Sequence, residues 1–302
     1  MTQMKTNFDK NVNKITYVAE DITMVDCHIH MVLDGVDWKQ AIARHSTAVD
    51  RKQVSETLET YRQKGYTYLR DGGDKWGVGA YARSVSGGYG ITLRTPLAPI
   101  CKAGHYGSFI GQSWETMQDY QNLVLQHRRE GADFIKLMIS GLMDFDRFGV
   151  LSEPGMDPKE LSQLIHIARE EGFSVMVHAN GARTVQAAAE AGVDSVEHGA
   201  YLDGDALHAM AENGTVWVPT LSTIGNLRGT GRFNENEVEK ILESALENVA
   251  AFHAMGGLLG SGTDAGAWAV PHGCDTETAL FALAGVTGEQ LAPGNRTIME
   301  KF

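Results

Sequence analysis

The sequence has few cysteines and few basic residues, and each shortage argues against a class of protein. Three cysteines among 302 residues are too few and too scattered for the disulfide framework of a small secreted domain. Lysine and arginine together number 26 against 38 aspartates and glutamates, so the formal net charge at pH 7 is −12. Because nucleic acids and anionic membranes bind clustered positive charge, this balance disfavours both as partners.

Long apolar runs are missing as well. The chain has no stretch of about 18 apolar residues, the length that a membrane-spanning helix requires. Residues 1–20 lack the apolar centre of a secretion signal, so we expect a cytoplasmic protein. With 43% hydrophobic and 21% charged residues, the composition is typical of a globular protein and not of a disordered one.

Eight short apolar runs, many of them rich in β-branched residues, recur along the chain. They lie at residues 23–30, 66–71, 91–100, 133–140, 173–179, 193–199, 215–221 and 257–264. Continuous apolar runs of this kind suit strands that are buried on both faces of a parallel sheet.

Helix signals occupy the segments between these runs. Before the fifth run, Asp157, Pro158 and Glu160 supply an N-cap, a proline in the first turn and a capping-box glutamate. An apolar repeat of helical period then starts at Leu161, and Gly172 ends it. The segment is therefore predicted to be an amphipathic helix.

Alternation of strands and helices predicts an α/β fold of the (β/α)8 TIM-like barrel type. We expect one domain over residues 1–302, with an N-terminal extension over residues 1–20. A doubly wound open sheet is the alternative architecture. It is less favoured because no glycine-rich phosphate loop follows the first run.

Histidines collect where the apolar runs end, which is where barrel enzymes hold their catalytic groups. His28 and His30 end the first run, and side chains two apart in a strand face the same way, so both imidazoles can reach one metal ion. His178, His198 and Asp264 end the fifth, sixth and eighth runs. Each alone is more often a core or turn residue, but their joint placement favours a metal centre.

Other charged residues also fall inside apolar runs. Lys136 lies within the fourth run, where an unpaired ammonium is costly to bury, so a chemical modification or a buried carboxylate partner is expected. Arg70 and Asp71 end the second run and are expected to form an ion pair. The histidines of helical stretches are expected at the surface: His45, His127, His166, His208 and His253.

These segments resemble those of the amidohydrolase superfamily of metal-dependent hydrolases. The similarity is strongest to the branch that contains imidazolonepropionase, prolidases and related carboxypeptidases, and it runs from about Asp21 to Pro293. Its most specific parts are the motifs VDCHIH, GYTYLRDGG, DFIKLMISG, FSVMVHANG, VDSVEHGAYLD, WVPTL and GSGTDAG.

The resemblance implies a site for two divalent metal ions. His28 and His30 would bind the buried ion, and His178 and His198 would bind the more exposed one. Lys136 would be carboxylated by carbon dioxide on its side-chain nitrogen and would bridge the two ions. Imidazole and carboxylate ligands suit zinc, and they also accept manganese, iron or cobalt.

The resemblance further implies three residues of the reaction itself. Asp264 would contact the first metal and the bridging hydroxide, and would pass a proton to the leaving nitrogen. His105, in the loop KAGHYG, and Tyr201, in EHGAY, match positions that bind substrate in this branch. The alternatives are a loop-stabilising hydrogen bond for His105 and simple packing for Tyr201.

The implied activity is hydrolysis, in which a metal-bridging hydroxide attacks the carbonyl carbon of a small-molecule substrate. The expected target is a carbon–nitrogen bond in an amide, a dipeptide, an N-acyl amino acid or a cyclic amide, in a substrate that can carry a carboxylate. A lactonase or esterase is the nearest alternative. A lyase, isomerase or decarboxylase, and a non-catalytic metal-binding relative, are further alternatives on the same scaffold.

Relatives in this branch add a β-sandwich built from both chain ends. Here about 22 residues precede the first run and 38 follow Asp264, so no separate β-sandwich domain is expected. Either the barrel stands alone, or the apolar surface that the sandwich covers in relatives meets another subunit, which predicts a homo-oligomer.

Overall fold

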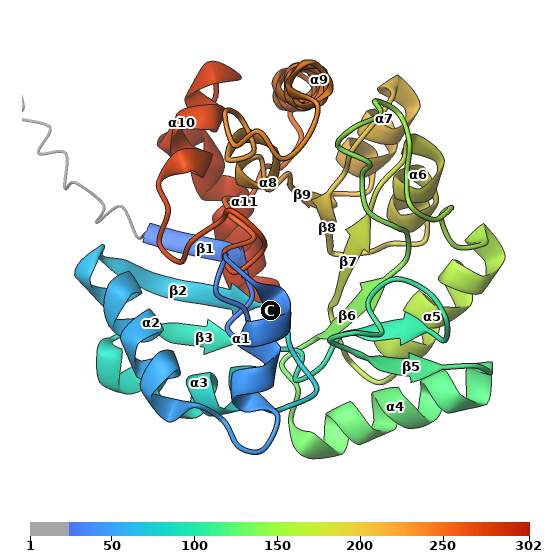
Figure 1. The fold of residues 1–302 in the computed structure, drawn as a ribbon. Coiled ribbons are helices and arrows are strands. Elements are labelled where there is room, and N and C mark those ends of the chain that lie inside the picture. Colours follow the sequence, from blue (N-terminus) through green and yellow to red (C-terminus); the bar gives the residue numbers. More distant parts are fainter. Residues whose placement is uncertain (1–23) are drawn as a thin grey trace, which may run out of the picture.

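Parallel strands lie at the centre of the molecule, and helices surround them (Figure 1). This computed structural model describes residues 24–302, and the expected extension over residues 1–20 lies outside the described residues. The strands are β1 (Met24–Ile29), β2 (Tyr66–Asp71), β3 (Thr92–Arg94), β4 (Ile100–Lys102), β5 (Gln112–Trp114), β6 (Ile135–Met138), β7 (Val175–Ala179), β8 (Ser195–His198) and β9 (Val216–Val218).

The helices form the outer layer. They are α1 (Trp38–His45), α2 (Arg51–Gln63), α3 (Val78–Ser86), the 3-10 turn η1 (Gly87–Tyr89), α4 (Met117–Glu130), α5 (Pro158–Glu170), α6 (Ala182–Glu190), α7 (Gly204–Glu212), α8 (Ser222–Gly225), α9 (Glu235–Ala254), α10 (Thr276–Leu283) and α11 (Gly288–Lys301). Within residues 24–302, no helix combines the length and the apolar character needed to cross a membrane.

The strands form two parallel sheets, with the orders β1-β2-β3 and β5-β4-β6-β7-β8-β9. Alternation of these strands with helices confirms a TIM-barrel-like α/β fold. Helix α5 also begins and packs as predicted, because the Asp157 side chain accepts hydrogen bonds from the first-turn backbone and Leu161 is buried.

The expected single strand over residues 91–100 is wrong, because it divides into β3 and β4. Pro96 and Pro99 lie between the two, and neither has an N–H for a ladder hydrogen bond. β3 pairs with β2, whereas β4 pairs with β6. The chain therefore leaves one sheet and enters the other at this break.

The eighth predicted strand, residues 257–264, is reduced to single bridges. Leu259 bridges Trp217 of β9, and Ala265, just past the run, bridges Ile29 of β1, so this segment contacts both sheets. Its glycines allow a very close approach: a Cβ at Gly262 would lie 2.5 Å from the Val218 side chain. Any larger residue there would push the segment away from the strands.

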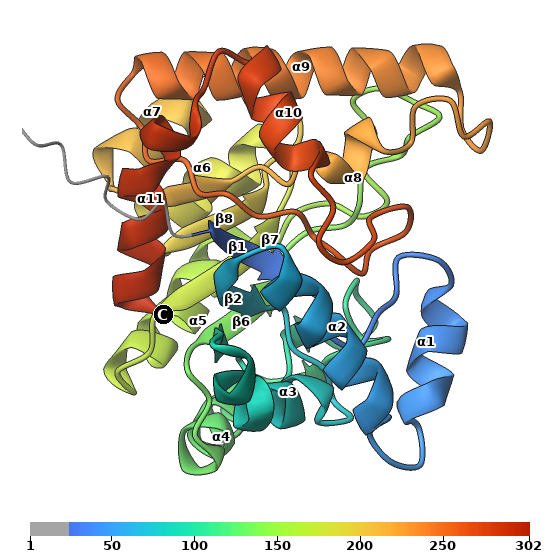
Figure 2. The same ribbon diagram turned by 90° about the vertical axis from the view of Figure 1, so that its left-hand side faces the viewer.

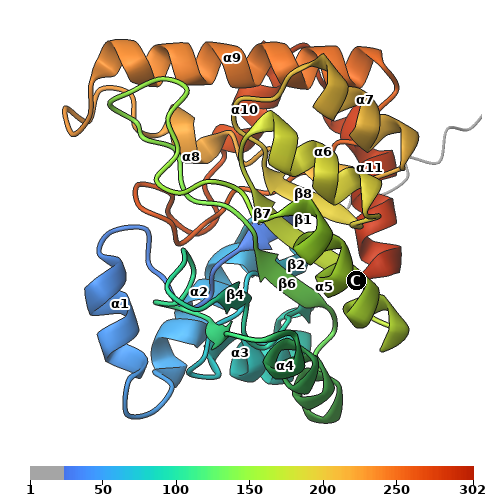
Figure 3. The same cartoon turned by 90° about the vertical axis from the view of Figure 1, so that its right-hand side faces the viewer.

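The two ends of the molecule differ. Helix α1 lies at one end, and the carboxyl end of α11 lies at the other (Figures 2 and 3). Near the carboxyl end, Phe302 packs edge-on against Phe134, with ring centroids 5.1 Å apart, and lies 4.5 Å from the Arg70 guanidinium. These contacts cover the buried side of the strands away from α1.

Two of the helical histidines are buried, contrary to expectation. His45 is 3% exposed and His127 is 1% exposed. Each ring meets a polar partner of its own: His45 Nδ1 accepts from the backbone N–H of Asp50, and His127 Nε2 lies 2.9 Å from Gln112 Oε1. A buried neutral imidazole with such a partner is tolerated on the inner face of a helix.

Burial of His127 predicts a pH-dependent stability. Burial lowers the pKa of its imidazole from 6.5 to about 4, so between these values the unfolded chain binds a proton that the folded chain does not. The free energy of unfolding should fall by about 2 kcal/mol between pH 7 and pH 5 through this group alone. His127→Gln should remove that part of the fall, measured by urea unfolding at both pH values.

The exposed His208 provides the control, because His208→Gln should leave the pH dependence unchanged. The same fall in stability for His127→Gln and for the unsubstituted protein would contradict this account of His127.

Candidate metal centre

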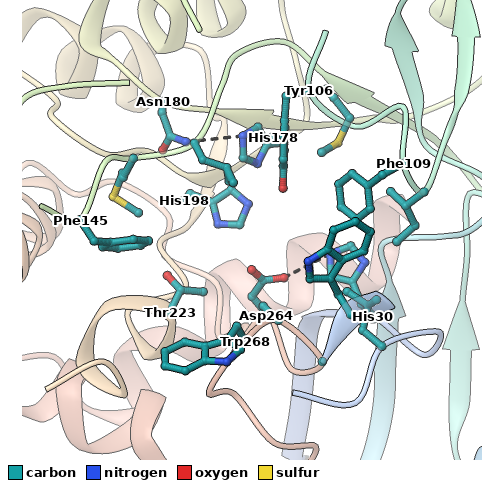
Figure 4. A pocket seen from close by; sticks show the side chains of 18 of the residues that line it. His30, Tyr106, Phe109, Phe145, His178, Asn180, His198, Thr223, Asp264 and Trp268 are labelled. Atoms are coloured by element: carbon teal, nitrogen blue, oxygen red, sulfur yellow. Dashed lines mark hydrogen bonds and ion pairs between the residues drawn. The ribbon is translucent and has the colours of Figure 1, made fainter. Parts of the chain in front are cut away.

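The strand-end histidines meet at one end of the strands. His30, His178, His198 and Asp264 converge on one cavity (Figure 4). The His178 and His198 ring centroids lie 4.6 Å apart, and the His28 ring lies 5.1 Å from that of His198 and 5.3 Å from that of His30. The structure thus brings together residues that are far apart in the sequence.

His28, His30 and Asp264 form the tightest part of this cluster. Their ligand atoms all lie within 4.8 Å of one another. Asp264 Oδ1 is 3.2 Å from His30 Nε2 and 3.4 Å from His28 Nε2. The backbone N–H of Asp264 donates to the carbonyl of His28 at 2.7 Å, which fixes the carboxylate beside the two imidazoles.

Asp264 is held in a left-handed backbone conformation, with φ 59°. The preceding residue supports this turn, because Thr263 donates to Asp26 from its backbone N–H at 2.9 Å and from its hydroxyl at 2.7 Å. Asp26 also accepts from the backbone N–H of His28. One buried carboxylate therefore orders both chain segments that supply the cluster.

Lys136 projects from β6 into the same cluster. It is 1% exposed, and its Nζ lies 3.0 Å from His28 Nε2. Burial lowers the pKa of this amine to about 8, although the Glu197 and Asp264 charges oppose the shift. Within residues 24–302, no carboxylate lies within ion-pair distance of Nζ, so the expected alternative of a carboxylate partner is not seen.

Three histidines of the cluster, His28, His178 and His198, are held neutral. Burial lowers the pKa of His28 and His198 well below the ordinary value, and that of His178 to about 3. The nearby Lys136 charge acts in the same direction. Neutral imidazole is the form that binds metal ions, so the environment favours ligation over protonation.

Buried charged side chains lie on the Nδ1 side of His28, away from the other residues of the cluster. Glu197 Oε2 lies 2.8 Å from His28 Nδ1, while its other oxygen accepts from Arg70 Nη2 at 2.8 Å and from Ser195 Oγ at 2.7 Å. A carboxylate on Nδ1 fixes the tautomer whose Nε2 lone pair faces a metal. Glu197 was not among the residues predicted from the sequence, although its place in the apolar run just before His198 is a signal.

The expected ion pair between Arg70 and Asp71 is wrong. Neighbouring side chains of a strand point to opposite faces, so the two residues of β2 separate. Arg70 pairs with Glu197, whereas Asp71 accepts from the backbone of Met31 at 3.0 Å and from the Thr95 hydroxyl at 2.9 Å.

His198 and His178 have partners on neighbouring loops. His198 Nδ1 lies 2.7 Å from the Thr220 hydroxyl. His178 lies next to Asn180, whose amide donates to the carbonyl of Gly141 at 3.0 Å. Asn180, 1% exposed, also lines the cavity and ties these strand ends together.

The donor set fits divalent metal ions. Asp264 Oδ1 is buried and has no hydrogen-bond donor among the described residues, as expected for an atom that a cation would satisfy. Four imidazoles, one carboxylate and one amine that can be modified surround the space. Nitrogen and oxygen donors of this kind are typical of zinc sites.

The cavity in front of the cluster has a volume of about 420 Å³ and mostly apolar walls. Methionines and leucines line part of it, and six aromatic side chains also contribute: Trp38, Tyr106, Phe109, Phe145, Phe233 and Trp268. Trp38 begins α1, and the other five come from loops whose paths the sequence patterns did not predict. The Tyr106 ring lies 4.8 Å from that of His178, so aromatic surface reaches the cluster itself.

His105 and Tyr201 lie outside this cavity. His105 is half-exposed, lines a neighbouring cavity of about 180 Å³, and lies 3.1 Å from Glu153 Oε2. Tyr201 packs against Phe148, with ring centroids 5.2 Å apart, and lines a small hollow next to His198. Neither residue lines the main cavity, although Tyr201 shares its small hollow with the ligand candidate His198.

Comparison with known proteins decides the family. The profile of the Amidohydrolase family matches residues 22–289. The chain belongs to this family. The resemblance seen in the sequence is therefore confirmed, and the strand-end cluster lies where the fold presents its site residues.

Individual relatives of this amidohydrolase are distant. It is 24% identical to ochratoxinase of Aspergillus niger over 279 residues, which covers 79% of this chain but only 56% of that protein. An Xaa-Pro dipeptidase structure with bound methionine gives a TM-score of 0.75 at 22% identity, covering 92% of this chain and 75% of the other. A prolidase-like structure from Bifidobacterium longum gives 0.72 at 20% identity, covering 92% and 69%. These structures share the fold.

The contact between Glu197 and His28 predicts a loss of metal affinity when it is weakened. Glu197→Gln keeps the shape but removes the charge that orients the imidazole, so zinc should bind about 10- to 100-fold more weakly. Competition with a chromophoric chelator measures this affinity. Glu160→Gln is the control, because Glu160 pairs with Lys102 outside the cluster. Equal zinc affinity in the two variants would show that the Glu197 contact does not support ligation.

Proposed function

We propose that this amidohydrolase is a metal-dependent hydrolase that cleaves a carbon–nitrogen bond of a small-molecule substrate at a site for two divalent ions, zinc by preference. The observation that carries the proposal is the convergence of four histidines, Lys136 and Asp264 on one end of an apolar cavity. Family membership supports it, as do relatives named as an ochratoxinase and an Xaa-Pro dipeptidase.

Lys136 is proposed to carry a carboxylate formed from carbon dioxide. The reaction needs a neutral amine, and burial favours that form. A carbamate would replace the amine by oxygen ligands and add a negative charge to a space whose other ligand atoms come from four imidazoles and Asp264. Both changes suit a bridge between two cations.

Bound at this cluster, two divalent ions would lower the pKa of a shared water and polarise the scissile carbonyl. Asp264 would accept the proton of that water and deliver it to the leaving nitrogen, since its Oδ1 faces the cluster without a hydrogen-bond donor among residues 24–302. The aromatic walls would exclude bulk water and hold an apolar substrate.

Three parts of the expectation stay predictions. His105 and Tyr201 are still candidates for contacts to a substrate that extends beyond the main cavity, into the neighbouring hollows that they line. A homo-oligomer is tested by light scattering, where a monomer at micromolar concentration would count against it. A cytoplasmic location is tested by fractionation of cells.

Asp264→Asn should abolish most of the hydrolysis while the protein stays folded. Loss of the proton-accepting carboxylate is expected to lower kcat by at least about a hundredfold. The assay uses zinc-loaded protein and a panel of dipeptides, N-acyl amino acids, cyclic amides and lactones. Asp203→Asn is the matched control, because asparagine caps the exposed start of α7 as well as aspartate does.

Unchanged turnover in Asp264→Asn would remove this residue from the mechanism. Turnover of lactones but of no amide would replace the proposed cleavage of a carbon–nitrogen bond by the lactonase alternative, since the same hydroxide can attack the carbonyl of either substrate.

A further inference from the structure

Among residues 24–302, one permanent cation lines the cavity away from the metal centre. Arg232 lies in the loop between α8 and α9, whereas the other charged lining residues, Lys136 and Asp264, belong to the cluster. The remaining walls are predominantly apolar. A substrate that fills the cavity would therefore meet a guanidinium at one place and metal ligands at another.

Aromatic rings hold this guanidinium at the cavity. The Arg232 Cζ lies 4.0 Å from the centroid of Trp268 and 5.3 Å from that of Phe233. Phe233 in turn contacts Phe145, with ring centroids 5.2 Å apart. Phe145 and Trp268 both face the cavity (Figure 4), so this group of aromatic side chains forms one of its walls.

Two acidic residues outside this loop, Glu235 at the start of α9 and Asp146, bind its backbone. Glu235 accepts from the backbone N–H groups of Gly229 and Gly231 at 3.0 and 3.2 Å. Asp146 accepts from the backbone of Asn234 at 2.8 Å. These contacts order the loop on both sides of Arg232 but leave its guanidinium without a carboxylate within ion-pair distance among residues 24–302.

An unpaired arginine at the cavity of this acidic protein has a specific chemical use. The planar guanidinium fork matches the two oxygens of a carboxylate, and stacking on an aromatic face leaves its N–H groups free to donate. A phosphate would call for more than one cation, and the other walls offer apolar surface. The matching ligand is a monoanion with an apolar or aromatic body.

We propose that Arg232 binds the carboxylate of the substrate and so selects N-acyl amino acids with aromatic or large apolar side chains over uncharged amides. This assignment rests on the proposed function, because only that function makes the bound carboxylate part of a substrate. Arg232 is thereby a specificity-determining residue, which neither motif nor spacing in the sequence had indicated.

The test measures binding to zinc-loaded protein by titration calorimetry. The probe is 2-benzyl-4-oxo-4-phenylbutanoate, in which a CH2 group replaces the nitrogen of N-benzoylphenylalanine and prevents hydrolysis. Its neutral carboxamide is the matched ligand. The acid should bind more tightly than the carboxamide. Arg232→Gln should lower the affinity for the acid at least about tenfold and leave the affinity for the carboxamide unchanged.

Arg228→Gln is the matched control variant. Arg228 lies in the same loop but pairs with Glu239, and it does not line the cavity. Three outcomes would overturn the assignment. Arg232→Gln could lower the affinity for both ligands equally, it could leave the affinity for the acid unchanged, or Arg228→Gln could lower the affinity for the acid by the same factor. A wild-type protein that binds neither ligand, or that binds the acid no better than the carboxamide, would overturn it as well.

A parallel assay with N-benzoylphenylalanine separates this inference from the proposed function. Binding selectivity that depends on Arg232, without hydrolysis of any amide, would overturn the hydrolase proposal and keep the carboxylate site. Amide hydrolysis without selectivity that depends on Arg232 would keep the hydrolase proposal and overturn the carboxylate site.

Discussion

The burial of the Lys136 amine is the constraint on which the rest of the site depends. An ammonium with no carboxylate in ion-pair contact is costly inside a protein, and here its hydrogen-bond partner is the ring of His28. The surroundings lower its pKa and keep the neighbouring imidazoles neutral. A cluster of this composition is poorly satisfied by protein contacts alone, and the proposed cations and carbamate would satisfy it.

The buried layer behind the cluster gives the imidazoles fixed directions. Glu197 joins His28 to Arg70, and Arg70 in turn lies against Phe302 at the far side of the strands. Asp26 ties the backbone of the first strand to the turn before Asp264. Side chains from distant parts of the sequence are thus held by short polar contacts, which preorganises the ligands before any ion binds.

Much of the strand-end cluster could be predicted from the sequence because its residues follow the simplest rule of the fold. His28, His178 and His198 all stand at the ends of apolar runs, and carboxyl ends of parallel strands meet at one edge. The cavity walls could not be predicted in this way. Trp268 and Arg232 lie in loops whose paths depend on tertiary contacts and not on a local period.

The two errors in the strand pattern also have local physical causes. Apolar composition alone indicated a strand over residues 91–100, but prolines without N–H groups interrupt it. In residues 257–264, glycines such as Gly262 permit close packing against β9 and leave only isolated bridges. For Arg70 and Asp71, adjacency in sequence suggested a pair that strand geometry separates.

The most direct test of the account is the metal content of the protein, purified without chelators and with bicarbonate present. Elemental analysis should find about two equivalents of divalent metal per chain, as a carbamate-bridged pair requires. About one equivalent would contradict the bridged pair and indicate an unmodified Lys136. No metal after reconstitution with zinc would contradict the ligand set as a whole.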